Sequence, residues 1–283
     1  MKLLRKFLLN TLNDYWFNYI MFISKVHYFP NFLSPRSLNE KLNYIKIHKT
    51  NYNLRCCLSD RLKVRNYVKE KTPECELIDI LWTGNYFTIE VWDSLPEKFV
   101  IKANHGSGMV KVVNKKYDTH VETQFVCNNW LKIDYSKIGK EWFYYNLDRI
   151  LIVEEYLEFS GDVPPDFKFF CMNGKIELVQ VDLDRFSGHT RNLYDKNFNR
   201  IDGELLYPQG YDIEKPNMYN HALNIAVKLS QEFDFIRVDL YLLDNKIYFG
   251  ELTNIPGNGT EKFKPKKLDF ELGKKLELSY ETN

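Results

Sequence analysis

The chain has 283 residues, of which 44% are hydrophobic, and this is enough to bury a substantial core in one large α+β body or in two packed units. Lysine and arginine number 39 and aspartate and glutamate 38, so a formal net charge of +1 provides no general field for attracting nucleic acid or an anionic membrane. The five cysteines form no C-x-x-C pair and have no histidine at zinc-ligand spacing, which favours reduced thiols in a cytoplasmic protein.

The first 30 residues predict a helix with an apolar face. Leu12, Tyr15, Trp16 and Tyr19 recur at helical spacing, and polar residues interrupt the apolar run that a signal peptide requires. No stretch of the sequence has the length and apolar content of a transmembrane segment. We expect this helix either to pack on its own domain or to make a peripheral contact, through residues 1–30, with the inner face of the membrane or with a partner.

Two further helices are expected before residue 75. Ser37 and Glu40 have the spacing of a capping box and predict a helix from about Ser37 to Lys49. A second helix is expected to begin at Asp60, whose negative charge suits a helix N-terminus, and to end before Pro73. Residues 1–75 are therefore expected to form a helical N-terminal region.

From residue 76 onward, short apolar runs between turn residues predict strands. The clearest hairpins turn at Asn173-Gly174 and Asp244-Asn245. A helix is expected between them, where apolar residues recur with helical periodicity from Ala222 to Phe233. Strands are expected at residues 77–81, 99–102, 151–153, 167–172, 175–183, 236–242 and 246–252.

One expected strand ends at Lys102 and runs into a small loop. The loop contains His105, Gly106, Ser107 and Gly108. Glycines let phosphate oxygens approach the main chain, and a serine adds a hydroxyl donor. The Walker pattern is absent, and a plain hairpin turn has a similar composition, so the segment indicates either a phosphate-binding loop or a simple turn.

A pair of carboxylates is expected on the last hairpin. Pairing across the turn at Asp244-Asn245 puts Asp239 opposite Glu251. Adjacent carboxylates repel each other unless a cation lies between them, and such a pair suits magnesium that bridges nucleotide phosphates. A surface pair is the alternative.

Two other segments carry chemistry-bearing side chains. The apolar strand at 151–153 passes into Glu154, Glu155, Tyr156 and Leu157, a stretch suited to pairing with an adenine edge and with ribose hydroxyls. Lys168 lies on the first strand of the Asn173-Gly174 hairpin. After its second strand come Arg185, His189 and Arg191, in a loop that either closes over a γ-phosphate and an acid substrate or is simply solvated.

In this order, these segments resemble the ATP-grasp superfamily. More narrowly, four segments resemble the TupA-like ATP-grasp family of bacterial surface-polysaccharide loci, and the resemblance runs from about residue 30 to 265. The four are Ser37–Lys41, Lys102–Gly108, Pro165–Phe170 and Gly250–Thr253. The resemblance implies an α+β ATP-grasp fold, in which two α+β subdomains, at 76–150 and 151–283, grip ATP between antiparallel sheets beyond a helical N-terminal extension at 1–75.

The resemblance also implies roles for particular residues. The nucleotide phosphates are contacted by Lys102 and covered by the loop from His105 to Gly108, and adenine is held by Glu154, Glu155, Tyr156 and Leu157. Two Mg²⁺ ions are bound by Asp239, Glu251 and one of Thr253 and Asn254, and Arg237 faces the transferred phosphoryl group. Arg61 and Lys63 stand near the position of a helix-borne lysine that reaches the phosphates in the superfamily.

The implied activity is that of an ATP-dependent carboxylate–amine ligase. A substrate carboxylate attacks the γ-phosphate of ATP to give an acyl phosphate, and an amine then displaces phosphate to leave an amide. The family's setting suggests a uronic acid or related carboxylate as the acid and an amino acid or other amine as the acceptor. Two alternatives are a glycosyltransferase, for which Asp182-Leu183-Asp184 is formally a D-x-D motif, and a nucleotide-binding scaffold without activity.

Overall fold

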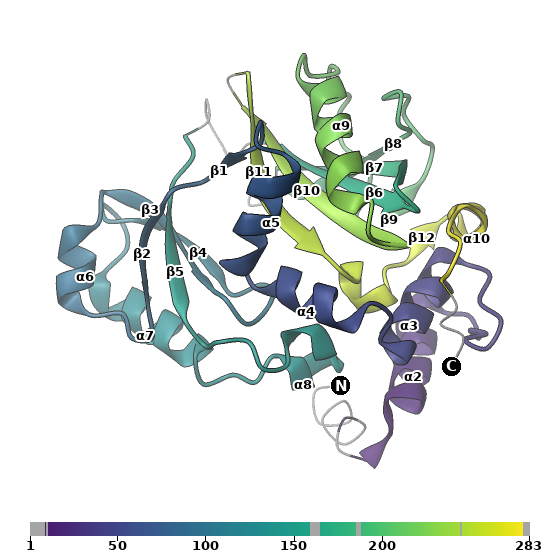
Figure 1. The fold of residues 1–283 in the computed structure, drawn as a ribbon, viewed down its shortest axis with the longest axis horizontal. Coiled ribbons are helices and arrows are strands. Elements are labelled where there is room, and N and C mark those ends of the chain that lie inside the picture. Colours follow the sequence, from purple (N-terminus) through teal and green to yellow (C-terminus); the bar gives the residue numbers. More distant parts are fainter. Residues whose placement is uncertain (1–8, 10, 159–164, 185–187, 244, 280–283) are drawn as a thin grey trace.

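The computed structural model describes residue 9 and residues 11–158, 165–184, 188–243 and 245–279 (Figure 1). Its helices are α2 (Asp14–Val26), α3 (Leu38–His48), α4 (Tyr52–Ser59), α5 (Lys63–Lys71), α6 (Ile89–Ser94), α7 (His120–Trp130), α8 (Ser136–Gly139), α9 (Tyr219–Ser230) and α10 (Lys266–Lys275), with 3-10 helices η1 (Trp142–Tyr144) and η2 (Pro256–Gly259). Its strands are β1 (Glu76–Leu77), β2 (Ile80–Gly84), β3 (Lys98–Ala103), β4 (Val110–Asn114), β5 (Leu151–Glu155), β6 (Asp166–Met172), β7 (Lys175–Leu183), β8 (Thr190–Tyr194), β9 (Glu204–Leu205), β10 (Phe235–Leu243), β11 (Lys246–Thr253) and β12 (Phe263–Lys264).

A six-stranded sheet, the large sheet, has the order β1-β11-β10-β6-β7-β8. All of its pairings are antiparallel except that of β1 with β11. The predicted hairpin at Asn173-Gly174 is confirmed, and both turn residues have positive φ, as a two-residue hairpin requires. The predicted register of the last hairpin is confirmed as well, because Asp239 pairs with Glu251.

Strand alternation gives the large sheet two different faces. One face is apolar and packs under α9 and α5, with Phe169, Val181 and Val238 in the shared core. The other face is apolar only at one end, where Phe170 and Phe235 pack with residues of α3 and α10. Its remaining part carries a row of charged side chains: Asp166, Lys168, Asp182, Arg237 and Asp239.

A four-stranded antiparallel sheet, the small sheet, has the order β2-β5-β3-β4. Phe99 and Ile101 of β3 point into a core shared with α6 and α7. Their neighbour Lys102 points to the opposite face because side chains alternate along a strand. Strand β5, which the sequence interpretation grouped with residues 151–283, is hydrogen-bonded between β2 and β3, so the small sheet extends at least to Glu155.

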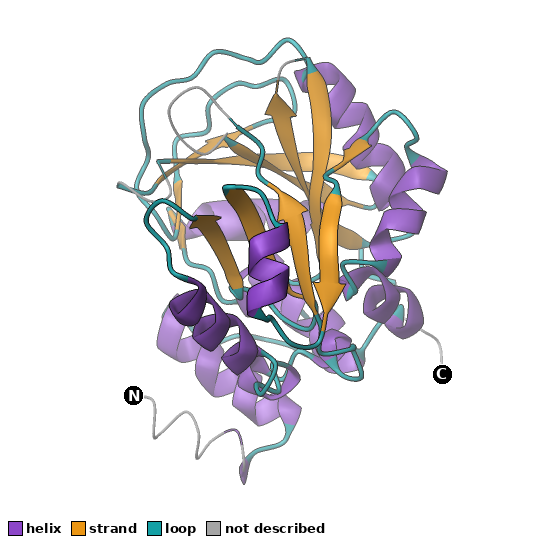
Figure 2. Ribbon diagram, turned by 90° about the vertical axis from the view of Figure 1, so that its left-hand side faces the viewer, coloured by secondary structure: helices purple, strands orange, loops and turns teal. Residues whose placement is uncertain are grey.

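The N-terminal helices join the two sheets. Figure 1 shows α4 and α5 between the small and large sheets, and Figure 2 shows the strands gathered in the middle of the molecule with helices around them. The capping box of α3 is confirmed, with Glu40 N donating to Ser37 Oγ at 3.1 Å. In the described part of the chain, no helix combines the length and apolarity needed to cross a bilayer.

The predicted helix after Asp60 is present, but it begins three residues later, since α5 starts at Lys63. Helix α4, which ends at Ser59, was not predicted. Asp60 instead caps the turn between them, since its Oδ1 accepts hydrogen bonds from the backbone N–H groups of Leu62, at 2.9 Å, and Lys63, at 3.2 Å. This turn brings Arg61 to the space between the sheets.

Candidate functional site

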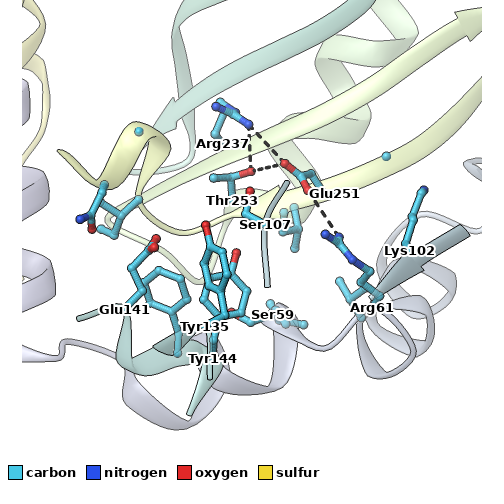
Figure 3. Close-up of a pocket in the computed structure, with 18 of the residues that line it drawn as sticks. Ser59, Arg61, Lys102, Ser107, Tyr135, Glu141, Tyr144, Arg237, Glu251 and Thr253 are labelled. Atoms are coloured by element: carbon cyan, nitrogen blue, oxygen red, sulfur yellow. Dashed lines mark hydrogen bonds and ion pairs between the residues drawn. The ribbon is translucent and has the colours of Figure 1, made fainter. Parts of the chain in front are cut away.

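A cavity of about 420 Å³ lies where the two sheets and the N-terminal helices meet (Figure 3). Its lining comes from β3, β5, β10 and β11, from the α4–α5 turn and from the segment that contains α8 and η1. The predicted site residues that line it are Arg61, Lys102, Ser107, Glu154, Arg237, Glu251 and Thr253. Residues from opposite ends of the sequence therefore share one polar cavity.

Three oxygen atoms converge on the guanidinium of Arg237. Its Nη2 lies 2.7 Å from Asp239 Oδ2, 3.0 Å from Thr253 Oγ1 and 3.4 Å from Glu251 Oε1. Two carboxylates and a hydroxyl around one cationic nitrogen form a hard-oxygen donor set, which is the kind that magnesium prefers. Among the described residues, no group of three or more His, Cys, Asp or Glu side chains is placed to hold a metal ion by itself, so other ligands would have to come from phosphate or water.

Asp239 is held by a second cation. Lys168 Nζ lies 2.9 Å from Asp239 Oδ2 and also contacts Asp166, and all three side chains are buried. Burial alone would lower the pKa of Lys168, but Asp166 and Asp239 outweigh it and the pKa is raised. Lys168 thus stays protonated and neutralises the carboxylates beneath the cavity.

Glu251 is more accessible than Asp239. Its side chain is 38% exposed, compared with 3% for Asp239. Although burial by itself would raise the pKa of Glu251, Arg61 and Arg237 lower it to about 2. Glu251 is therefore ionised at any physiological pH, as a metal ligand must be.

Lys102 and the loop after it form the small-sheet wall of the cavity. The Lys102 ammonium forms an ion pair with Glu154 of the neighbouring strand β5. Ser107 lines the cavity, and Gly108 has a φ of +74°, which glycine adopts without strain. His105 is turned away from the cavity, since it is buried and its Nε2 lies 3.1 Å from the carbonyl oxygen of Trp130.

The segment expected to hold adenine is only partly at the cavity. Glu154 lines it, whereas Glu155, Tyr156 and Leu157 are not among the described residues that do. The Glu155 backbone N–H donates to the carbonyl of Asp79 at 3.0 Å, and the Tyr156 ring lies 5.5 Å from Lys98 Nζ. The structure thus brings one of these four residues next to Lys102.

Arg61 connects the loop after Lys102 to the carboxylates. It donates to the carbonyls of Ala103, at 3.2 Å, and Gly106, at 3.1 Å, and its Nη1 lies 3.5 Å from Glu251 Oε2. Lys63 is 60% exposed, pairs with Asp60 at 3.5 Å and does not line the cavity. Of these two candidate cations, only Arg61 reaches the cavity.

The structure separates Thr253 from Asn254. Thr253 Oγ1 donates to Glu251 Oε1 at 3.0 Å inside the cavity. Asn254 points the other way, where its Oδ1 accepts from Arg55 at 3.2 Å and its Nδ2 donates to Ser59 at 2.9 Å. Thr253 is therefore the candidate for a third metal ligand.

The segment after β7 forms a separate cluster. Arg191 Nε donates to Asp182 Oδ1 at 2.6 Å, and its guanidinium lies 4.9 Å from the centre of the Tyr207 ring. The His189 ring stacks on Tyr207 with centroids 3.8 Å apart. None of these residues lines the cavity, and Arg185 lies outside the described residues.

Several cavity residues were not predicted from the sequence. Tyr135, Glu141 and Tyr144 come from the segment between α7 and β5, Lys25 comes from α2, and Asn258 comes from η2. They belong to no motif with regular spacing. Only the fold, which brings the segment between α7 and β5 to the end of the large sheet, places them at the cavity.

The sequence and the structure were compared with known proteins. The family model described as TupA-like ATPgrasp matches residues 40–277. No curated protein matches the sequence significantly. Among solved structures, a D-alanine–D-alanine ligase from Bacillus anthracis complexed with ATP has 15% identity and a TM-score of 0.43, and the match covers 71% of this chain and 55% of that one.

Two other solved structures are similar at the same level. A D-alanine–D-alanine ligase from Helicobacter pylori has 17% identity and a TM-score of 0.42, with 78% of this chain and 61% of that one covered. The ATP-grasp ligase PsnB, complexed with a minimal precursor, has 8% identity and a TM-score of 0.41, with 72% and 55% covered. The chain thus spans little more than half the length of the structures it matches. Because the family model covers most of the sequence, and the molecule has the expected α+β architecture, the chain belongs to the TupA-like ATP-grasp family.

Proposed function

We propose that the protein is an ATP-dependent carboxylate–amine ligase that forms an amide through an acyl phosphate. The observation that carries the proposal is the meeting of Lys102, Arg237 and Glu251 in one cavity between the two sheets. Lys102 on the small-sheet wall, together with Arg237 and the ionised Glu251 on the large-sheet wall, provides the cations and the carboxylate that a magnesium-bound triphosphate requires.

The task of these residues is chiefly electrostatic. A triphosphate repels the substrate carboxylate that must attack it, and the positive charges of Lys102, Arg61 and Arg237 reduce that repulsion. No protein nucleophile is needed for in-line attack by the substrate. In this proposal Lys102 and the loop at Ser107 bind the phosphates, and Arg237 orients the transferred phosphoryl group.

The residues proposed to hold magnesium are at the large-sheet wall, where Glu251 and Thr253 line the cavity and Asp239, only 3% exposed, lies behind them. The donor set of Asp239, Glu251 and Thr253 surrounds the cationic nitrogen of Arg237, so its oxygens already face a positive charge. Mg²⁺ held by these residues would supply positive charge that neutralises the phosphate oxygens. Asp239 Oδ2 also accepts a hydrogen bond from Lys168, and this contact limits how far the Asp239 carboxylate can rotate.

The acid substrate we propose is a uronic acid or related carboxylate of bacterial surface-polysaccharide biosynthesis, and the acceptor is an amino acid or other amine. We propose that the enzyme works in the cytoplasm. This part is supported by the family resemblance alone. The glycosyltransferase alternative is not favoured, because Asp182 is buried and its oxygens accept hydrogen bonds from Arg191 and Gln180.

A peripheral contact is also part of the proposal. Helix α2 and the loop after it expose Trp16, Phe29 and Leu33, whose exposed fractions are 52%, 77% and 81%. The sequence before them carries Lys2, Arg5 and Lys6. Exposed apolar side chains that follow basic residues in the sequence suit the surface of an anionic membrane.

The test of the ligase proposal measures ATP turnover and amide formation together. The protein is incubated with Mg-ATP, a panel of uronic acids and a panel of amino acids, and ADP, phosphate and the mass of any amide are followed. Lys102→Met should abolish ADP release, whereas Lys111→Met, which removes another ion-paired lysine of the small sheet, should leave it unchanged. Consumption of a UDP-sugar without ADP release would instead support a glycosyltransferase.

A further inference from the structure

The turn before α5 anchors the loop after Lys102. The backbone N–H of Arg61 donates to Asn104 Oδ1 at 2.8 Å, and Asn104 is only 1% exposed. The Arg61 guanidinium donates to two carbonyls of the same segment, those of Ala103, at 3.2 Å, and Gly106, at 3.1 Å. The backbone and the side chain of Arg61 therefore both hold this loop.

The same guanidinium reaches the large sheet. Arg61 Nη1 lies 3.5 Å from Glu251 Oε2, and Figure 3 shows the guanidinium directed at Glu251. Ala103 and Gly106 belong to the small-sheet side of the cavity, whereas Glu251 is on β11. All three nitrogens of the guanidinium thus face an oxygen of the protein, and one planar group, 16% exposed, spans the two walls of the cavity.

A second arginine lies one helical turn further along. The Val64 backbone N–H donates to the carbonyl of Asp60 at 3.0 Å, so residues 60–64 already form a helical turn. Arg61 and Arg65 are four residues apart and lie on one face, with Arg65 about 6 Å further along the axis. Arg65 lines the cavity, as Arg61 does.

Arg65 differs from the other cations that line the cavity. Lys102 pairs with Glu154, Arg237 pairs with Asp239, and Lys25 has an interaction partner as well. Within the part of the chain that the structure describes, Arg65 makes no hydrogen bond, ion pair or ring contact. Its N–H donors are therefore available to an anionic ligand, and their geometry matches the oxygens of a phosphate group.

We infer that Arg61 is a positioning residue, which fixes the loop after Lys102 against Glu251, and that Arg65 is the cation of this helix face that contacts the nucleotide phosphates. The inference rests on the proposed ligase function and divides two roles within its site. It differs from the superfamily pattern, in which the helix-borne lysine itself reaches the phosphates. Here the side chain near that position is directed at protein oxygens, and the next turn of the helix carries the available charge.

The two roles make opposite demands on the side chain. Positioning by Arg61 depends on shape, because a single ammonium nitrogen does not span the places that three guanidinium nitrogens occupy. The phosphate contact of Arg65 depends chiefly on charge, which lysine keeps and glutamine loses. Lysine should therefore fail at position 61 and serve at position 65.

Isothermal titration calorimetry with Mg-ADP tests this pattern, with melting temperatures measured in parallel. We expect Arg61→Lys to weaken Mg-ADP binding roughly tenfold or more, and Arg65→Gln to weaken it roughly ten- to a hundredfold, the size of one lost charge-assisted contact. Arg65→Lys should bind within about threefold of the wild type, because the charge is kept. Arg149→Lys, an exposed arginine outside the cavity that lies 3.8 Å from Asp134, is the matched control.

Hydrogen exchange of the nucleotide-free protein separates positioning from general stability. The backbone N–H groups of Ala103 and Asn104 are hydrogen-bonded in the structure. Both should exchange faster in Arg61→Lys than in the wild type, while the amides of β6 and β10 keep their wild-type rates. In Arg65→Gln, the amides of Ala103 and Asn104 should exchange as in the wild type.

Two results would overturn the inference. Wild-type affinity and wild-type exchange of the loop amides in Arg61→Lys would remove the positioning role of Arg61. Wild-type affinity in Arg65→Gln would remove the phosphate contact. The ligase proposal fails separately, if the wild-type protein does not bind Mg-ADP; if the wild type binds Mg-ADP and both variants bind it equally well, only the division of roles fails.

Discussion

Replacement of Glu251 by glutamine should separate its role in activity from its role in stability. Glutamine keeps the shape of the side chain and can still accept the hydrogen bond from Thr253, but it removes the charge that faces Arg61 and Arg237. Those two ion-pair distances are long, at 3.5 and 3.4 Å, and the side chain is 38% exposed. Because solvent screens such pairs, we expect Glu251→Gln to cost less than about 1 kcal/mol of stability.

Activity should respond much more strongly. A carboxylate that binds a catalytic metal contributes several kcal/mol to the transition state, so Glu251→Gln should reduce ATP turnover by roughly a hundredfold or more. ADP release is measured across a series of magnesium concentrations, with the melting temperature followed in parallel and Glu70→Gln, on the exposed side of α5, as control. Turnover and magnesium dependence equal to those of the wild type would refute the metal-site assignment.

Three other predictions follow from buried and exposed side chains. Burial lowers the pKa of Lys46 from 10.5 to about 7, so between these pH values the unfolded chain holds a proton that the folded chain has released. The free energy of unfolding should therefore rise with pH, by up to about 1.4 kcal/mol per pH unit. Lys46→Met should remove this rise, which urea titrations at several pH values measure. Arg237→Gln leaves the buried Asp239 without its main partner and should lower the free energy of unfolding by about 3 kcal/mol, also measured with urea. The double change of Trp16 and Phe29 to serine should weaken flotation with anionic liposomes, because both side chains are exposed and apolar.

Each of these predictions has a result that contradicts it. For Lys46, it is a rise in stability with pH that persists in the methionine variant. For Arg237, it is a variant as stable as the wild type, which would mean that Lys168 alone neutralises Asp239. For Trp16 and Phe29, the contradicting result is that the double variant floats with the liposomes as the wild type does, or that the wild-type protein does not float with them at all.

The parts of the fold that the sequence predicted are those set by local geometry. Ser37 and Glu40 lie three residues apart and form the capping box of α3. The turn at Asn173-Gly174 and the pairing of Asp239 with Glu251 depend on chain segments that are close in the sequence. Turn chemistry and strand alternation fix such features, so the hairpins and the carboxylate pair could be predicted from them, whereas the ATP-grasp fold was implied by the family resemblance.

Other parts depend on contacts that leave no local pattern. Helix α4 begins after Asn51, which has positive φ and makes no side-chain cap, so no start signal marks it. Arg61 reaches the carbonyls of Ala103 and Gly106, more than forty residues away, only because α4 and α5 lie between the sheets. Arg55, which α4 carries into the core, also decides that Asn254 turns away from the cavity. The roles of the cavity residues in binding and catalysis stay predictions.

The covalent link between the two sheets limits how the cavity can widen. Strands β1 and β2 belong to different sheets, and only Ile78 and Asp79 separate them. Three chain steps reach at most about 11 Å, so the two edges stay close together at this point, where Ile78 itself lines the cavity. The cavity can therefore widen more easily on the side remote from Ile78, and we expect a bulky substrate to enter there.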